Sequence, residues 1–116
     1  MEKILYKTEK GKGSVKFKMY LQKKVNKKLL GEISVTTDEE RDDFLFVSSS
    51  YIESKYRGKG YGKKLYTHAI KKLGKLKTTY FEASEQAQYV WVSLSKKFKY
   101  RKDFFNGVLT LYNKTK

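Results

Sequence analysis

The residues best suited to bind a ligand lie between a strand-like apolar segment that ends at Ile52 and an amphipathic segment around Leu65. The connecting stretch combines three glycines with two cations: Arg57, Gly58, Lys59, Gly60 and Gly62. Glycines let backbone N–H groups approach a ligand closely, and a helix start adds unpaired N–H groups and a positive dipole end. The stretch therefore predicts a loop that binds pyrophosphate; a glycine-rich turn that binds nothing, or another anion, is the alternative.

The spacing of these glycines excludes two common nucleotide motifs. It is not G-x-G-x-x-G, and no Lys-Ser or Lys-Thr pair follows at the Walker A position. It does match R-x-x-G-x-G, formed by Arg57, Gly60 and Gly62, and between a strand and a helix it resembles the signature of the GNAT superfamily of N-acetyltransferases. The resemblance implies acetyl-coenzyme A (acetyl-CoA) as the cofactor. It places the cofactor-binding residues at Tyr51, Ile52, Arg57, Gly58, Lys59, Gly60, Tyr61, Gly62 and Lys63.

Hydrophobic periodicity predicts one α/β domain over residues 1–116, with a mixed sheet and the order β-β-β-β-α-β-α-β-β. Strands are expected over 3–8, 14–22, 29–36, 44–52, 77–83, 99–105 and 108–112. Leu29, Gly31, Ile33 and Val35 should lie on one side of the third strand, the apolar side. Helices are expected from Gly60 to about 73, and from an N-cap at Ser84. The GNAT resemblance covers about 29–112, and the helices that usually follow the family's first strand are lacking.

Acetyl transfer to a primary amine requires a group that removes the amine proton, because an amine with a pKa near about 10 is protonated at neutral pH. A carboxylate, or water held by one, can take that proton. The candidates are Glu32 on the third strand, Glu82 on the fifth strand and Glu53 after the fourth strand. For each of them, a solvated strand residue is the alternative interpretation. The resemblance implies that a backbone N–H near 51–52 stabilises the oxyanion.

The general acid that the resemblance implies, a tyrosine in the last helix, has no clear counterpart. Aligning that helix on Ser84 places Trp91 at the tyrosine position, and aligning it on the following strand places Ser95 there. Tyr89, one turn away, is the remaining candidate. The absence of a general acid would not prevent catalysis, because the leaving thiolate belongs to a thiol with a pKa near about 8.5 and needs little help from a proton donor.

Two further features allow more than one interpretation. Ser48, Ser49 and Ser50 interrupt an otherwise apolar strand. They indicate either hydroxyl groups that face the cofactor arm or a strand face that is partly exposed. His68 lies among the lysines of the first helix, and we expect it on the protein surface.

The net charge of +15 is concentrated in the second half of the chain. Residues 1–52 carry 11 basic and 8 acidic groups, a net of +3, whereas residues 53–116 carry 16 and 4, a net of +12. This field favours polyanionic ligands such as the cofactor, and disfavours cationic acceptors. It also supports an alternative function, a small basic module that contacts nucleic acid and has a GNAT-like fold with little or no turnover.

Composition excludes several kinds of metal site and membrane protein. Without cysteine and with one histidine, the chain offers no thiolate or multi-histidine metal site. The sequence contains no run of about 18 apolar residues, so no membrane span is predicted. We expect a cytoplasmic protein. The partners expected are acetyl-CoA and an amine acceptor whose identity the sequence does not give, with a homodimer as one way to complete the acceptor pocket.

Overall fold

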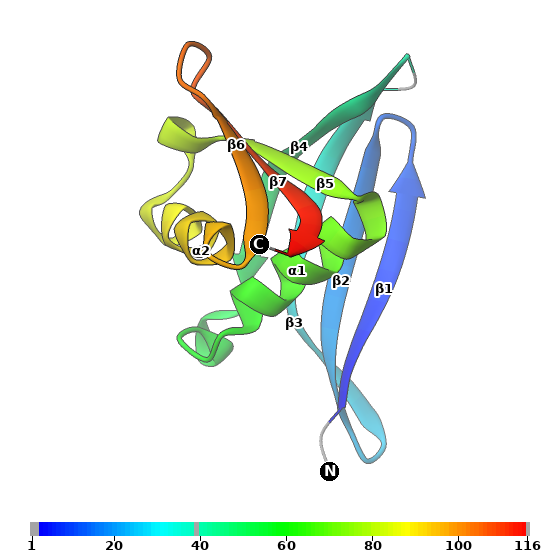
Figure 1. The fold of residues 1–116 in the computed structure, drawn as a ribbon. Helices are drawn as coiled ribbons and strands as arrows, with labels where there is room; N and C mark the ends of the chain where they lie inside the picture. Colours follow the sequence, from blue (N-terminus) through cyan, green and yellow to red (C-terminus); the bar gives the residue numbers. More distant parts are fainter. Residues whose placement is uncertain (1–2, 39, 116) are drawn as a thin grey trace.

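A mixed sheet organises the protein in the computed structural model, which describes residues 3–38 and 40–115 (Figure 1). Within these residues the sheet has seven strands in the order β1-β2-β3-β4-β5-β7-β6. The strands are β1 (Lys3–Gly11), β2 (Ser14–Lys23), β3 (Asn26–Asp38), β4 (Arg41–Ile52), β5 (Lys75–Thr79), β6 (Phe98–Asp103) and β7 (Val108–Thr115). The helices are α1 (Tyr61–Leu73) and α2 (Glu85–Ser95), with short 3₁₀ turns η1 (Ser54–Tyr56) and η2 (Tyr80–Glu82). The predicted fold class and element order are confirmed.

The first four strands form antiparallel hairpins, because only two residues separate each strand from the next. In β2, Val15, Phe17, Met19 and Leu21 are buried, and the residues between them are partly exposed. The buried side faces α1. No described helix packs on the opposite side of β1–β4, which corresponds to the lack of helices between the first two strands.

The start of β3 departs from the predicted alternation. Met19 and Tyr20 pair with Gly31 and Leu29, so a bulge leaves Leu30 as the extra residue. Leu30 is completely buried, whereas Leu29 is only partly buried. The prediction that Leu29 shares the buried side of the strand was wrong, because an inserted residue reverses the alternation of side chains.

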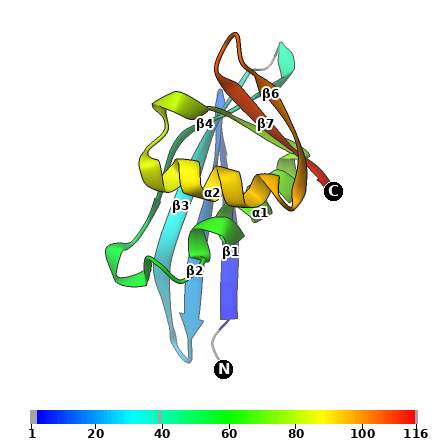
Figure 2. The same ribbon diagram turned by 60° about the vertical axis from the view of Figure 1, so that its left-hand side comes forward.

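Both helices cover the same face of the sheet (Figure 2). The connections β4-α1-β5 and β5-α2-β6 move in the same direction across the sheet, and right-handed crossovers then place their helices on one side. The ring of Tyr66 in α1 meets that of Trp91 in α2 edge-on, with 5.5 Å between centroids. α1 ends at Gly74, whose φ of +87° gives the C-cap predicted by the sequence.

The fifth strand is shorter than the predicted span 77–83. It ends at Thr79, which pairs with Val108, the first residue of β7. Beyond this point β5 has no ladder partner, and the chain turns into η2. The prediction that Glu82 lies on the fifth strand was therefore wrong; Glu82 is an exposed residue of the turn.

His68 also differs from its predicted surface position. Its ring stacks on Tyr6 of β1 with 3.9 Å between centroids, and contacts Phe17 edge-on. Its Nε2 atom is buried without a hydrogen-bond partner among the described residues. Burial lowers the pKa of His68, and the nearby charge of Lys72 lowers it further. The sequence could not reveal this, because β1 approaches α1 only in the folded sheet.

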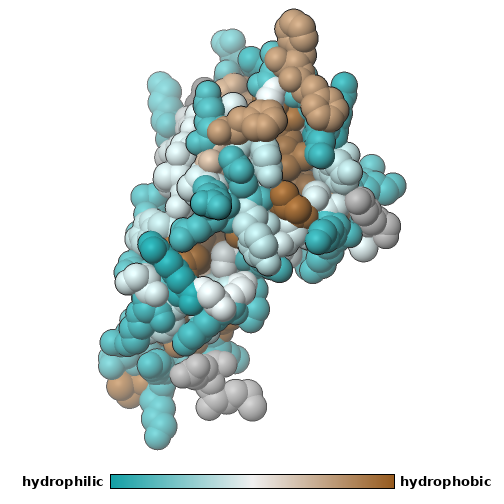
Figure 3. All heavy atoms as spheres, turned by 90° about the vertical axis from the view of Figure 1, so that its left-hand side faces the viewer, coloured by the Kyte–Doolittle hydropathy of each residue, from teal (hydrophilic) through white to brown (hydrophobic). Residues whose placement is uncertain are grey.

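The hairpin of β6 and β7 ends in an exposed aromatic tip, formed by Phe81, Phe104 and Phe105 (Figure 3). Phe104 and Phe105 are 82% and 97% exposed, and Phe81 of η2 is 75% exposed. Phe81 lies beside the hairpin turn, close to Gly107. No described helix has the length and apolar composition that a bilayer crossing requires.

Candidate functional site

The glycine-rich stretch forms a cradle of backbone donors at the start of α1. Gly60 is the N-cap with φ +83°, and no side chain caps the helix. The first turn contains no acidic residue. The N–H groups of residues 61–63 therefore lack the partners that a capping side chain would provide. Together with the positive helix end, they form a site that favours an anion.

The two glycines before α1 keep this cradle open. Gly58 and Gly60 have φ values of +79° and +83°, a conformation that favours glycine. A Cβ atom added to either residue would meet no other atom within 4 Å. The loop around Gly58 and Gly60 is therefore not covered by other protein atoms at these positions.

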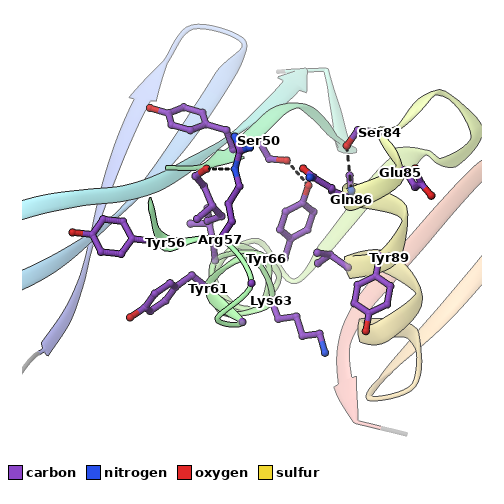
Figure 4. Close-up of a pocket in the computed structure, with 18 residues that line it drawn as sticks. Ser50, Tyr56, Arg57, Tyr61, Lys63, Tyr66, Ser84, Glu85, Gln86 and Tyr89 are labelled. Atoms are coloured by element: carbon purple, nitrogen blue, oxygen red, sulfur yellow. Dashed lines mark hydrogen bonds between the residues drawn. The ribbon is translucent and has the colours of Figure 1, made fainter. Parts of the chain in front are cut away.

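The cradle opens into a cavity of about 750 Å³ between the end of β4, α1 and the first turns of α2 (Figure 4). This volume lies within the range of small-molecule and cofactor sites. β4 and β5 pair only at Phe46 and Lys77 and then separate, which makes room for the cavity. An uncapped donor cradle beside a cavity of this size fits a cofactor with a diphosphate group.

Three cations lie at or near the cradle. The Nε atom of Arg57 donates to the carbonyl oxygen of Ile52 at 2.8 Å, so its side chain folds back onto the end of β4. Lys63 lines the cavity, with its Nζ atom 5.9 Å from the centre of the Tyr89 ring. Lys59 is exposed in the loop. The charge that accompanies the N–H groups therefore has the sign that a phosphorylated ligand requires.

The serine run of β4 divides between exposed and cavity-facing positions. Ser48 and Ser49 are exposed, whereas Ser50 lines the cavity and its Oγ atom lies 2.6 Å from the hydroxyl oxygen of Tyr66. Burial raises the pKa of the Tyr66 phenol, and hydrogen bonds with Ser50 and Trp91 partly offset this effect. Tyr66 was not singled out from the sequence, where it reads as part of an apolar helix stripe.

The proposed catalytic carboxylates lie in different environments. Glu32 is partly buried on β3, opposite Tyr51, and its Oε1 atom lies 3.8 Å from Nζ of Lys16. The pKa of Tyr51 is raised by burial and by the charges of Glu32 and Glu53. Glu53 is exposed directly after β4, and neither Glu32 nor Glu53 lines the cavity.

Tyr89 lines the cavity from α2, but its side chain is 69% exposed. Its ring lies 5.9 Å from Nζ of Lys63, at the side of the cavity where α1 begins. Among the described residues, no group of acidic and histidine side chains is arranged to hold a metal ion.

Comparison with known proteins identifies the family of this chain. A family model described as the acetyltransferase (GNAT) family matches residues 5–92, most of the chain, and the chain therefore belongs to the GNAT acetyltransferase family. No curated protein sequence matches it.

Solved structures share the fold at low sequence identity. The ribosomal-protein-S18-alanine N-acetyltransferase from Escherichia coli is 12% identical with a TM-score of 0.60, over 100% of this chain and 96% of that one. A domain from Methanocaldococcus jannaschii is 17% identical with a TM-score of 0.58, over 85% of this chain. This chain spans 65% of that domain's length. Such similarity establishes the fold, and the predicted family is confirmed.

Proposed function

We propose that this protein transfers an acetyl group from acetyl-CoA to a primary amine. The observation that carries this proposal is the uncapped start of α1 behind Gly58 and Gly60, open to a cavity of cofactor size. Membership of the GNAT family supports acyl transfer as the reaction class. We keep the cytoplasm as the proposed compartment.

The residues of the cradle have the donors and charges that acetyl-CoA requires. The N–H groups of Tyr61, Gly62 and Lys63 would bind the diphosphate, and Arg57 and Lys59 would add positive charge beside it. When bound, the cofactor supplies the acetyl group as a thioester. Backbone N–H groups near the end of β4 would hydrogen-bond the oxygen on which charge develops.

The acceptor amine must lose a proton before or during its attack on the acyl carbon. We propose Glu32 as the first candidate for this role, ahead of Glu53 and Glu82, which are both exposed. Glu32 is partly buried on the helix-free side of the sheet, and its Oε1 atom lies 3.8 Å from Nζ of Lys16. This side of the sheet is open to an acceptor, or to a second subunit of a homodimer that completes the pocket.

The decisive test is thermal denaturation with acetyl-CoA. At a ligand concentration about 100 times Kd, binding stabilises the folded state by about 2.7 kcal/mol, or roughly 10 °C in Tm for a chain of this length. Gly60→Asp should abolish the shift, because a carboxylate in the cradle repels the diphosphate. Gly13→Asp is the matched control: Gly13 also has a positive φ, +73°, in the β1–β2 turn. Thiol release with candidate amines then measures turnover. No shift at millimolar acetyl-CoA would refute the proposal.

A second candidate function, binding of nucleic acid with little turnover, is favoured by the edge strand β6. Lys99, Arg101 and Lys102 are all exposed there, beside Tyr100. Exposed cations with an aromatic ring suit a phosphate backbone and its bases. If Gly60→Asp loses acetyl-CoA binding and keeps salt-dependent RNA binding, the two activities use different surfaces.

A further inference from the structure

A chain of hydrogen-bonding side chains runs from the core to the cavity wall. It starts at Trp91 of α2, which is completely buried, and continues through Tyr66 of α1, which is 3% exposed. It ends at Ser50 of β4, which lines the cavity. Tyr66 is hydrogen-bonded to Ser50, and its ring meets that of Trp91 edge-on. Figure 4 shows Ser50 and Lys63 on opposite sides of the Tyr66 ring.

The direction of this chain follows from the donors that each residue has. An indole N–H can only donate, so the contact with Trp91 offers the Tyr66 proton no acceptor. The Tyr66 proton is buried and needs an acceptor of its own, because leaving it unpaired costs free energy. The Oγ atom of Ser50, 2.6 Å away, is the acceptor available among the described residues. Ser50 therefore keeps its own proton for a partner in the cavity.

We propose that the Ser50 hydroxyl, oriented by Tyr66 and Trp91, donates a hydrogen bond to the sulfur of the bound coenzyme. This inference rests on the proposed function. A ligand whose diphosphate is held at the cradle would extend from there into the cavity, which Ser50 also lines. Hydrogen bonds along one direction also polarise each other, which strengthens the last donor.

In the reaction, this donor would act when the carbon–sulfur bond breaks and the carbon–nitrogen bond forms. Ser50 would stabilise the electron pair that remains on the sulfur, without losing its own proton. The amine proton leaves through a carboxylate or water, and the thiolate takes up one proton from solvent. Ser50 would then replace the helix tyrosine that Tyr89 does not provide, and Tyr66 would be a positioning residue.

Coenzyme A itself is the probe for this proposal, so that no acceptor is needed. A hydrogen bond to the thiolate favours the charged form, and we expect the thiol of coenzyme A bound to the wild type to titrate about one pH unit below that of free coenzyme A. The titration is followed by thiolate absorbance. Ser50→Ala should raise the pKa of the bound thiol to the free value or above, and Tyr66→Phe should raise it part of the way.

Ser49→Ala is the matched control, since Ser49 is exposed on the same strand and does not line the cavity. It should leave the thiol titration unchanged. Trp91 is the single tryptophan, so its fluorescence reports directly on the chain: Tyr66→Phe should shift the emission, and Ser50→Ala should change it little.

The outcomes separate the two proposals. If coenzyme A raises Tm and Ser50→Ala leaves the thiol titration as in the wild type, the Ser50 proposal is wrong while the cradle stands. If wild-type protein does not bind coenzyme A, both proposals fail. Should Ser50→Ala not fold, Tyr66→Phe alone decides: an unchanged thiol titration and an unchanged Trp91 emission overturn the chain.

Discussion

Gly31 is the position where a single methyl group has the most predictable effect. It lies on β3 opposite Ile52, and a Cβ atom there would sit 2.3 Å from the carbonyl oxygen of Tyr51 and 2.7 Å from Cδ1 of Ile52. Ordinary contacts at a Cβ begin at 3.4 Å. Gly31→Ala must therefore push β3 and β4 apart by roughly 1 Å, and the first obstacle is backbone, which cannot rotate away.

The expected cost follows from two effects. Overpacking of this kind costs about 1–3 kcal/mol, and the upper end applies because the contact is with backbone. Loss of a neighbouring ladder hydrogen bond adds about 1 kcal/mol. A total of about 3 kcal/mol corresponds to a decrease in Tm of roughly 12 °C for a chain of this length. Because Tyr51 and Ile52 line the cavity, the stabilisation by acetyl-CoA should also weaken.

Thermal denaturation followed by far-ultraviolet circular dichroism, with urea unfolding as a second measure, tests this prediction. Gly11→Ala is the control, because its Cβ would lie 3.3 Å from the Oγ atom of Ser14, a side chain that can rotate. We expect Gly11→Ala to change Tm by less than about 3 °C. A Gly31→Ala variant that melts within about 3 °C of the wild type would show that the strands separate easily, and the reasoning would be wrong.

Two further predictions concern stability. Because the folded-state pKa of His68 is lowered from 6.5, the unfolded state binds the proton more readily, and stability should fall as the pH decreases below about 6.5. His68→Phe should therefore flatten the dependence of Tm on pH between pH 7 and pH 5. An equal slope in the variant and the wild type would contradict this prediction. Ser84 accepts a hydrogen bond from the Ala87 N–H at 3.1 Å. Ser84→Ala should therefore lower the free energy of unfolding by about 1 kcal/mol, or Tm by roughly 4 °C. Ser93→Ala, inside α2, serves as the comparison and should lower Tm less.

Local patterns in the sequence predicted most of the elements. Alternation in β2, helical spacing in α1, the Ser84 N-cap and the Gly74 stop each depend on neighbouring residues alone. The cradle was predicted for the same reason, since glycine spacing and a helix start are adjacent in the chain. Assignment of the cofactor-binding residues remains a prediction that acetyl-CoA binding will test.

The errors arose where a distant segment determines the outcome. Leu30 replaces Leu29 on the buried side because β2 and β3 pair with a bulge. β5 stops at Thr79 because β7, nearly thirty residues later, begins opposite it. His68 is covered by Tyr6 from the first strand. No sequence pattern links any of these residues to the distant segment that contacts it.

The sequence by itself determined the family, the order of the elements and the position of the glycine-rich loop, because each is encoded in residues close together along the chain. Only the tertiary structure decided which hydroxyl faces the cavity and what orients it. Ser50, Tyr66 and Trp91 come from β4, α1 and α2, and their contacts form once helix packing on the sheet brings the three segments together.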